Sequence, residues 1–387
     1  MNAVVLGNGR SGKAAAELLR REGACVTVLD GEDVWPKGEW NICVTSPGVP
    51  LDHPWQKAAR AAGVPVISEL QLGVERFRAA GGKMLAVTGS KGKSSVVKLV
   101  AYAVGGVPCG NYGTPVCEVA LQSQPWAVVE VSSFQMETTV LSPDTFVAAA
   151  VLNLQEDHLD RHGSIEVYHA LKRRLLDFAM VKIMGTDPEK ESEVGALFKN
   201  SYFDNPVLLN NALCAIRLMR AAGLSDDAIR AAFARFEPLP HRMQTVSVFG
   251  GVTWIDDSKA TSIAALVAGV TMAASRFAGS VPKIHLIAGG LPKGDDPELA
   301  RESLSKWVGK VHLIGQCASQ FEAAWHDVVP CEICGTLEQA VKSAAASATD
   351  GDCVLLSPGT ASFDQFKSYG DRGDTFCRCV LILRCSS

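Results

Sequence analysis

The sequence predicts an α/β protein made of three successive domains, each built on a mainly parallel sheet. Short apolar runs alternate with helical patterns along most of the chain, and a glycine-rich loop at residues 89–94 opens the middle part. Two breaks, at residues 81–82 and 236–242, interrupt the alternation. Because alternating strands and helices form sheets covered by helices, we expect domains at 1–82, 83–238 and 239–387, with hinges at the two breaks.

The composition indicates a soluble globular enzyme. The chain has 387 residues, of which 47% are hydrophobic, enough for sizeable cores. A net charge of −4 with dispersed charges provides neither a basic face for nucleic acid nor a polybasic arm for a membrane. With no membrane-length apolar run and no signal-peptide pattern, we expect a cytoplasmic protein. No feature sets the oligomeric state, and we favour a monomer.

The first domain has the pattern of a nucleotide-binding unit. Strands are expected at 3–6, 25–29 and 41–44, with a helix at 13–21. The turn from Gly7 to Gly12 fits G-x-G-x-x-G, and Asp30 follows the second strand, where dinucleotide-binding folds place a ribose-binding acid. Taken alone, this pattern indicates NAD. The alternative is a parallel sheet whose glycines serve packing only.

The loop at 89–94 is typical of a phosphate cradle. An apolar run ends at Gly89, the loop passes Gly92, and a helical pattern resumes at Ser95. Glycines let backbone N–H groups approach a phosphate, Lys93 can reach the outer phosphates, and Ser94 can ligate Mg²⁺. The loop is two residues shorter than G-x-x-x-x-G-K-[ST]. Its position between a strand and a helix favours ATP or GTP over a lysine-rich turn.

Two further side chains follow apolar strands of the middle domain. Glu130 ends a run that would otherwise be buried, where an unpaired carboxylate is costly. His158 follows the next such strand, in an acidic loop at 155–161. With Ser94, these residues predict a site for Mg²⁺ or Mn²⁺ held together with phosphate. The alternative for His158 is an ordinary solvated histidine.

The twelve cysteines indicate reduced thiols more than a zinc site. Most stand singly in apolar segments, where a thiol behaves as a small buried hydrophobe; examples are Cys25, Cys43, Cys214 and Cys353. The pairs at 331/334 and 377/379 lack a correctly spaced second pair, so zinc is disfavoured. The sequence offers no explanation for the cysteine-rich stretch 377–385.

Several motifs occur together in the order found in the Mur ligase family, which the chain resembles over nearly its whole length. The Glu130–Gln135 and Ala361–Phe366 segments point to the D-glutamate-adding branch of that family. The matching segments are Thr45–Pro50, Thr88–Ser94, Gly110–Pro115, Glu130–Gln135, Asn153–Asp160, Leu239–Arg242, Asp257–Thr261 and Ser357–Phe366.

The resemblance implies a Rossmann-like N-terminal domain for the UDP part of the substrate, a central P-loop ATPase domain, and a Rossmann-like C-terminal domain for the incoming amino acid. In this interpretation, the turn from Gly7 to Gly12 binds UDP and not NAD. The implied reaction uses ATP to add D-glutamate to UDP-N-acetylmuramoyl-L-alanine through an acyl phosphate, in peptidoglycan precursor synthesis. Two Mg²⁺ ions are implied, with Mn²⁺ as a substitute.

The resemblance also assigns residues to roles, and it implies that Lys172 is carbamylated; the alternative is an ordinary surface lysine. The implied catalytic residues are Lys93, His158 and Lys172, and the metal ligands are Ser94, Glu130, His158 and Lys172. The implied ATP contacts are Gly89, Ser90, Lys91, Gly92, Lys93, Ser94, Ser95, Asn211, Arg242, Asp257 and Lys259. The implied contacts to the UDP substrate are Gly7, Arg10, Ser11, Asp30, Gly31 and Asn111. The implied contacts to D-glutamate are Thr261, Lys293, Ser362, Phe363 and Tyr369.

Three departures from the family pattern keep other hypotheses open. Leu291 replaces a common acidic residue, and Gly31 offers no hydroxyl to uracil. Only 38 residues separate Lys172 from Asn211, about half the usual family span. The alternatives are a sibling ligase that adds another amino acid and a catalytically impaired nucleotide-binding scaffold. A nicotinamide-dependent dehydrogenase would leave the phosphate loop unexplained.

Overall fold

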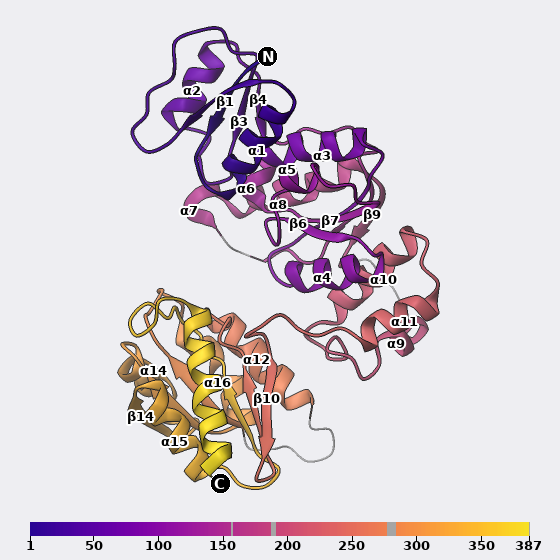
Figure 1. The fold of residues 1–387 in the computed structure, drawn as a ribbon. Coiled ribbons are helices and arrows are strands. Elements are labelled where there is room, and N and C mark those ends of the chain that lie inside the picture. Colours follow the sequence, from indigo (N-terminus) through magenta and orange to yellow (C-terminus); the bar gives the residue numbers. More distant parts are fainter. Residues whose placement is uncertain (156–157, 187–190, 277–283, 387) are drawn as a thin grey trace. The chain divides into compact units, whose positions relative to one another are not determined.

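The structure, a computed structural model, describes residues 1–155, 158–186, 191–276 and 284–386 (Figure 1). The chain divides into two compact units. The first comprises Met1–Asp204 and Leu208–Phe236, and the second comprises Asn205–Val207 and Glu237–Ser387. The first unit carries two separate parallel sheets and the second carries one larger sheet. Each unit is therefore described by itself.

The N-terminal sheet is parallel and covered on both faces. Its strand order is β2-β1-β3-β4. Successive residues of β1 point to opposite faces: Ala3 and Val5 pack with residues of α1 and α3, whereas Val4 and Leu6 pack with Trp55 of α2. This arrangement confirms the predicted α/β sheet. The elements are β1 (Asn2–Leu6), α1 (Arg10–Arg21), β2 (Cys25–Leu29), β3 (Ile42–Thr45), α2 (Pro54–Ala61), β4 (Val66–Ser68) and α3 (Glu69–Ala79).

The central sheet has the order β6-β7-β5-β8-β9, and all its strand pairs are parallel. Because β5 lies between β7 and β8, the phosphate loop after β5 and Glu130 at the end of β7 share the carboxyl edge of the sheet. The strands are β5 (Lys83–Thr88), β6 (Val107–Gly110), β7 (Trp126–Glu130), β8 (Phe146–Val151) and β9 (Ala179–Met184). The helices are α4 (Lys93–Ala103), α5 (Val116–Val119), α6 (Ser133–Met136), α7 (Leu159–His162), α8 (Ile165–Arg173), η1 (Arg174–Phe178), α9 (Glu191–Phe198), α10 (Leu209–Ala221) and α11 (Asp226–Ala234).

The sheet of the second unit has the order β10-β11-β15-β12-β13-β14, with β10 antiparallel and the other pairs parallel. The edge strands β10 and β14 were not predicted from the sequence, because only one residue of each is buried and neither forms a continuous apolar run. The strands are β10 (Gln244–Phe249), β11 (Val252–Asp256), β12 (Ile284–Gly289), β13 (Val308–Ile314), β14 (Cys331–Gly335) and β15 (Cys353–Leu356). The helices are α12 (Ile263–Ser275), η2 (Pro297–Ala300), α13 (Arg301–Trp307), α14 (Ala318–Trp325), α15 (Leu337–Ser347) and α16 (Tyr369–Ser386).

The cysteine-rich stretch lies in helix α16, drawn in yellow in Figure 1. Phe376 and Val380 of this helix are fully buried in a cluster with Trp254 of β11. The helix is therefore part of the core of the second unit. Within the described residues, no helix is long and apolar enough to cross a membrane.

All twelve cysteines are free thiols. Burial raises the thiol pKa of Cys43 and of Cys353 to about 12, which keeps both protonated. The prediction of a buried thiol was wrong for Cys25, which is exposed because β2 is an edge strand. Cys385 at the end of α16 is also exposed.

A buried carboxylate at the start of α3 makes the stability of the first unit depend on pH. Glu69 is 1% exposed, its Oε1 accepts the Cys117 N–H at 2.8 Å, and burial raises its pKa to about 7. Below pH 4.5 both folded and unfolded states are protonated, so nothing is lost. As pH rises to 7 the unfolded state ionises first, and stability falls by about 3 kcal/mol.

We therefore expect Glu69→Gln, which keeps the acceptor oxygen, to stabilise the protein at pH 8 and to leave its stability unchanged at pH 4.5. Urea unfolding of both proteins at the two pH values measures this difference. Glu75→Gln, on the exposed side of the same helix, is the control and should change neither value. An equal gain at both pH values would show that ionisation is not the cause.

Candidate active site

The phosphate loop joins β5 to α4, as the sequence predicts. The helix begins at Lys93, two residues before the predicted start, because Gly92 caps it in the left-handed conformation at φ +84°. The Lys93 ammonium lies against its own loop, donating to the carbonyls of Gly89 at 2.8 Å and Ser90 at 3.1 Å. The Ser90 hydroxyl lies 3.2 Å from the Tyr168 hydroxyl. The helix start leaves backbone N–H groups available to an anion.

Asn211 closes one side of this loop. It is buried in α10, and its amide lies so close to Gly92 that a side chain at position 92 would collide with it. The family resemblance implied an ATP contact for Asn211, 119 positions after Gly92, and the structure brings the two residues together. Position 92 therefore requires glycine for two reasons, its backbone conformation and its contact with Asn211.

We expect Gly92→Ala to weaken ATP binding by at least tenfold. The variant carries the strain of positive φ, roughly 1 kcal/mol, and also displaces Asn211. Gly105→Ala is the matched control, because Gly105 has φ +63° but nothing within 4 Å of an added side chain. Calorimetric titration with ATP should show weakened binding in the first variant only. Similar binding by both variants would contradict the role of the Asn211 contact.

Glu130 has one satisfied and one unsatisfied oxygen. The residue is 2% exposed, and its Oε1 accepts from Asn111 Nδ2 at 2.7 Å. Its Oε2 is buried and has no hydrogen-bond partner among the described residues. A buried carboxylate oxygen in this state favours a bound cation. The structure thus places Asn111, expected at the substrate, directly beside the expected metal ligand.

Lys172 is not a surface lysine. It is 2% exposed, and its Nζ donates to the Gly89 carbonyl at 3.0 Å and lies 4.5 Å from the centre of the Tyr168 ring. This finding removes the surface alternative and places the residue at the phosphate loop. His158 is exposed, has φ +53°, and packs its ring near Phe134 at 5.0 Å between centroids. The acidic residues 156 and 157 lie outside the described residues.

The turn after β1 has the geometry that its glycines predict. Gly7 has φ +86°, and the Gly7 carbonyl leaves no room for a side chain at Gly12. Asp30 is exposed just past β2, followed by Gly31 at φ +57°. Arg10, expected at the UDP substrate, donates from Nη2 to the Gly113 carbonyl at 2.9 Å. It therefore links α1 to the loop after β6.

In the second unit, Asp257 is the most perturbed of the expected nucleotide-side residues. It is 8% exposed and accepts from Ser357 Oγ at 3.0 Å and from the Met243 N–H at 3.2 Å. Burial raises its pKa to about 7, and the nearby charge of Arg242 opposes that rise. Lys259 Nζ lies 3.9 Å from the centre of the Tyr369 ring, which joins two predicted site residues.

Lys293 lines a cavity of about 160 Å³ in the second unit. The other expected D-glutamate contacts do not line it: Ser362 is 2% exposed in the loop after β15, Phe363 is 69% exposed, and Thr261 is half-buried. Side chains that sequence reasoning missed complete the lining, among them Asp295, Gln320 and Thr360. Because these residues follow different strands, they lie far apart in the sequence and form no continuous motif.

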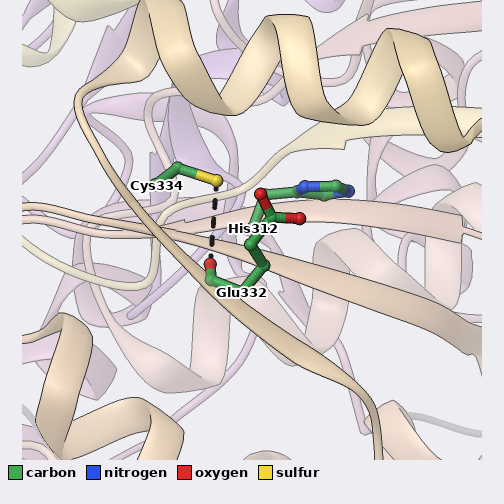
Figure 2. A group of neighbouring side chains, drawn as sticks. All are labelled: His312, Glu332 and Cys334. Carbon is green, nitrogen blue, oxygen red and sulfur yellow. Dashed lines mark hydrogen bonds between the residues drawn. The ribbon is translucent and has the colours of Figure 1, made fainter.

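A histidine, a carboxylate and a thiol meet on β13 and β14 (Figure 2). His312 is paired in register with Glu332, and Cys334 follows two residues later on the same face, with their ligand atoms within 4.8 Å of one another. Cys331, the other half of the pair considered for zinc, lies outside this group. Lys310 Nζ lies 2.7 Å from Glu332 Oε2 and already neutralises that carboxylate. The group therefore supports no metal site here.

Two family models match the chain. The Mur ligase middle domain matches residues 87–201, and the Mur ligase glutamate ligase domain matches residues 241–359. The UDP-N-acetylmuramoylalanine--D-glutamate ligase of Acidobacterium capsulatum is 34% identical over 461 residues, covering 98% of this chain and 96% of that protein. This chain belongs to the Mur ligase family. The like-named ligase of Sphingopyxis alaskensis is 37% identical over 435 residues, with 98% and 96% covered.

Solved structures agree with this Mur ligase fold. The UDP-N-acetylmuramate-alanine ligase of Thermotoga maritima matches with a TM-score of 0.61 at 16% identity, over 100% of both chains. The MurF ligase of Thermotoga maritima in complex with ADP matches at 0.58 and 16%, over 88% of this chain and 94% of that one. The alignment to the Acidobacterium ligase runs over 461 positions against 387 residues here, so that relative carries residues that this Mur ligase lacks.

Proposed function

We propose that this Mur ligase uses ATP to join D-glutamate to UDP-N-acetylmuramoyl-L-alanine in peptidoglycan precursor synthesis. Near-full-length identity of 34% and 37% to two ligases that carry this name supports the proposal most strongly. The phosphate loop, with Glu130 and Lys172 beside it, supports ATP use. We assign residues 1–82 to the UDP substrate, 83–238 to ATP and 239–387 to the amino acid.

In the proposed reaction, the acceptor carboxylate attacks the γ-phosphorus of ATP, which forms an acyl phosphate and releases ADP. The amine of D-glutamate then attacks the acyl carbon, an amide bond forms, and phosphate leaves. Lys93 would neutralise the phosphates, because its ammonium already lies at the loop. D-glutamate would bind in the second unit, where Lys293 offers an ammonium to a carboxylate.

Ser94, Glu130, His158 and carbamylated Lys172 would hold the divalent cations. Bound Mg²⁺ would supply further positive charge to the phosphate oxygens. The unsatisfied oxygen of Glu130 fits this assignment, since hard carboxylate oxygens are what Mg²⁺ prefers. Lys172 fits because its Nζ is buried against the phosphate loop rather than solvated.

Phosphate release from ATP tests the proposal. UDP-N-acetylmuramoyl-L-alanine is supplied with D-glutamate, L-lysine or meso-diaminopimelate in turn. We expect release with D-glutamate only. Release with another amino acid would identify a sibling ligase. If none of the three amino acids causes phosphate release although ATP binds, the chain is better described as a catalytically impaired scaffold. The short segment between Lys172 and Asn211 would then be the first part of the chain to test.

A further inference from the structure

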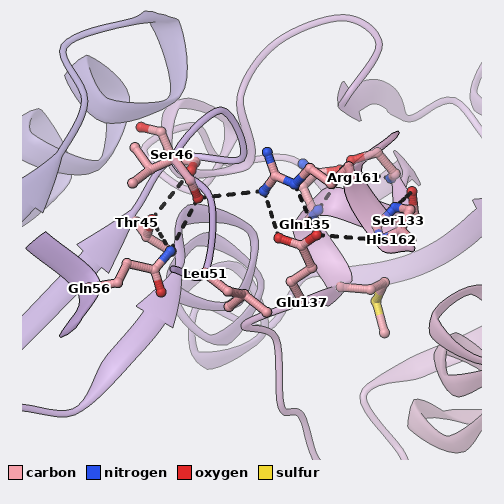
Figure 3. Close-up of polar contacts among 12 residues, drawn as sticks. Thr45, Ser46, Leu51, Gln56, Ser133, Gln135, Glu137, Arg161 and His162 are labelled. Atoms are coloured by element: carbon pink, nitrogen blue, oxygen red, sulfur yellow. Dashed lines mark hydrogen bonds and ion pairs between the residues drawn. The ribbon is translucent and has the colours of Figure 1, made fainter. Parts of the chain in front are cut away.

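A loop of the N-terminal sheet and helix α7 of the central domain meet at one backbone carbonyl, that of Val49. Figure 3 shows Gln56 and Arg161, whose side chains reach it from the two sides. This carbonyl accepts from Gln56 Nε2 at 3.1 Å and from Arg161 Nη2 at 3.5 Å. Gln56 is 1% exposed and lies 3.4 Å from Thr45 Oγ1 at the end of β3. The N-terminal domain therefore fixes the carbonyl, and Arg161 reaches it from the central domain.

Arg161 is itself held in place. Its Nε lies 3.0 Å from Glu137 Oε1 and its Nη2 lies 2.6 Å from Glu137 Oε2, a two-point ion pair. The guanidinium also stacks on the Phe134 ring at 4.4 Å. The two charged side chains are only 15% and 7% exposed. Because water competes little at that burial, this pair is stiffer and more costly to break than a surface pair.

His162, the next residue, makes a second connection from α7 to α6. Its Nε2 lies 3.0 Å from Ser133 Oγ, and its Nδ1 lies 3.5 Å from Glu137 Oε1. Glu137 is thus shared by two successive side chains of α7, the helix that begins directly after His158. We call Val49, Glu137 and Arg161 the Arg161 bridge.

The bridge joins two regions that the substrate must span. In the proposed reaction, the N-terminal domain holds the nucleotide end of the acceptor, and the acceptor carboxylate reacts near His158, three residues before Arg161. The bridge therefore fixes the distance between these two subsites. We propose that the Arg161 bridge sets the length of acceptor that the enzyme accepts. This inference rests on the proposed function and adds positioning residues to which the sequence analysis gave no role.

Adding or removing one amino acid moves the acceptor carboxylate by about 3.5 Å. A misplacement of about 1 Å can already cost on the order of 10²-fold in rate. With the bridge intact, only the acceptor of matching length reaches the phosphate in a reactive position. Without it, the two domains can adjust to other lengths, at the expense of the matched acceptor.

The test compares three nucleotides: UDP-N-acetylmuramate, its L-alanine derivative, and that derivative extended by one residue. We expect Arg161→Ala to lower kcat/KM for the L-alanine acceptor by about 10²-fold and to leave the KM for ATP within twofold. The preference for the L-alanine acceptor over the other two should fall at least tenfold. Arg161→Lys should recover part of the preference, because it keeps the charge but loses the two-point contact.

Arg76→Ala is the matched control. Arg76 of α3 forms a pair of the same two-point geometry, though more exposed, with Glu22 directly after α1, at 2.7 and 3.2 Å. It should leave the acceptor preference unchanged. Dissociation constants of the three nucleotides, measured without ATP, report the preference independently of turnover.

If Arg161→Ala lowers only the melting temperature and leaves the acceptor preference unchanged, the proposed role of the Arg161 bridge is wrong. Failure of the wild type to turn over any acceptor would instead overturn the proposed function, while the dissociation constants would still decide the bridge. A lost preference in both Arg161→Ala and Arg76→Ala would likewise count against a specific role.

Discussion

Replacing Lys93 with methionine is expected to lower ATP turnover by about 10²–10³-fold, the usual cost of removing a positive or hydrogen-bonding group from a developing charge. Methionine keeps the length of the side chain and removes its ammonium. That ammonium now lies against the carbonyls of Gly89 and Ser90, so it sits at the loop before any nucleotide arrives. Steady-state phosphate release at saturating substrates measures the effect.

The control for this variant is Lys98→Met, on the same helix, where the ammonium lies 5.6 Å from the Phe236 ring instead of at the loop. Its turnover should stay within twofold of the wild type. Equal losses in both variants would mean that helix α4 had been disturbed, and that Lys93 has no special part in phosphate chemistry.

Glu130→Gln is expected to change activity and stability in opposite directions. Turnover should fall by about 10²-fold, because the amide is a poor ligand for Mg²⁺. The contact to Asn111 survives, since the amide oxygen can still accept it. In metal-free buffer the variant should melt about 2–4 °C higher, because it removes the charge of a buried carboxylate whose Oε2 has no hydrogen-bond partner among the described residues.

Two measurements check this prediction. Mn²⁺ titration followed by electron paramagnetic resonance should show weaker binding in Glu130→Gln, and thermal unfolding in chelator should show the gain. A loss of melting temperature together with unchanged Mn²⁺ affinity would assign Glu130 a purely structural role. The pairing of effects matters, because a merely damaged fold would lower both activity and stability.

The strands and the phosphate loop could be predicted because their causes are local. The fully buried run before Gly89, the two glycines and the following helix pattern lie within one short stretch, and the structure reproduces them with a two-residue shift at the helix start. The strand predicted at 25–29 coincides with β2, because its apolar run is equally local. The edge strands β10 and β14 have fewer buried apolar residues, so an apolar run indicates them less clearly.

Contacts between distant segments could not be predicted in the same way. The surface alternative for Lys172 could not be removed from the sequence, because the Gly89 carbonyl that it contacts lies 83 positions away. Arg161 and Glu137 are 24 positions apart, with Arg161 in α7 and Glu137 directly after α6. Arg10 fits a ligand-binding motif, yet it pairs with Gly113 in the loop after β6 of the central sheet. Such pairings follow from how the sheets pack, which periodicity does not encode.

The two exposed cysteines allow movement between the two compact units to be measured on the natural sequence. Ten of the twelve cysteines are at least partly buried, and the two exposed ones, Cys25 and Cys385, fall in different compact units. A thiol-reactive dye pair should therefore attach one fluorophore to each unit without engineered cysteines. Energy transfer between the dyes would report whether ATP and the acceptor bring the units together, in a single cuvette and on the time scale of turnover.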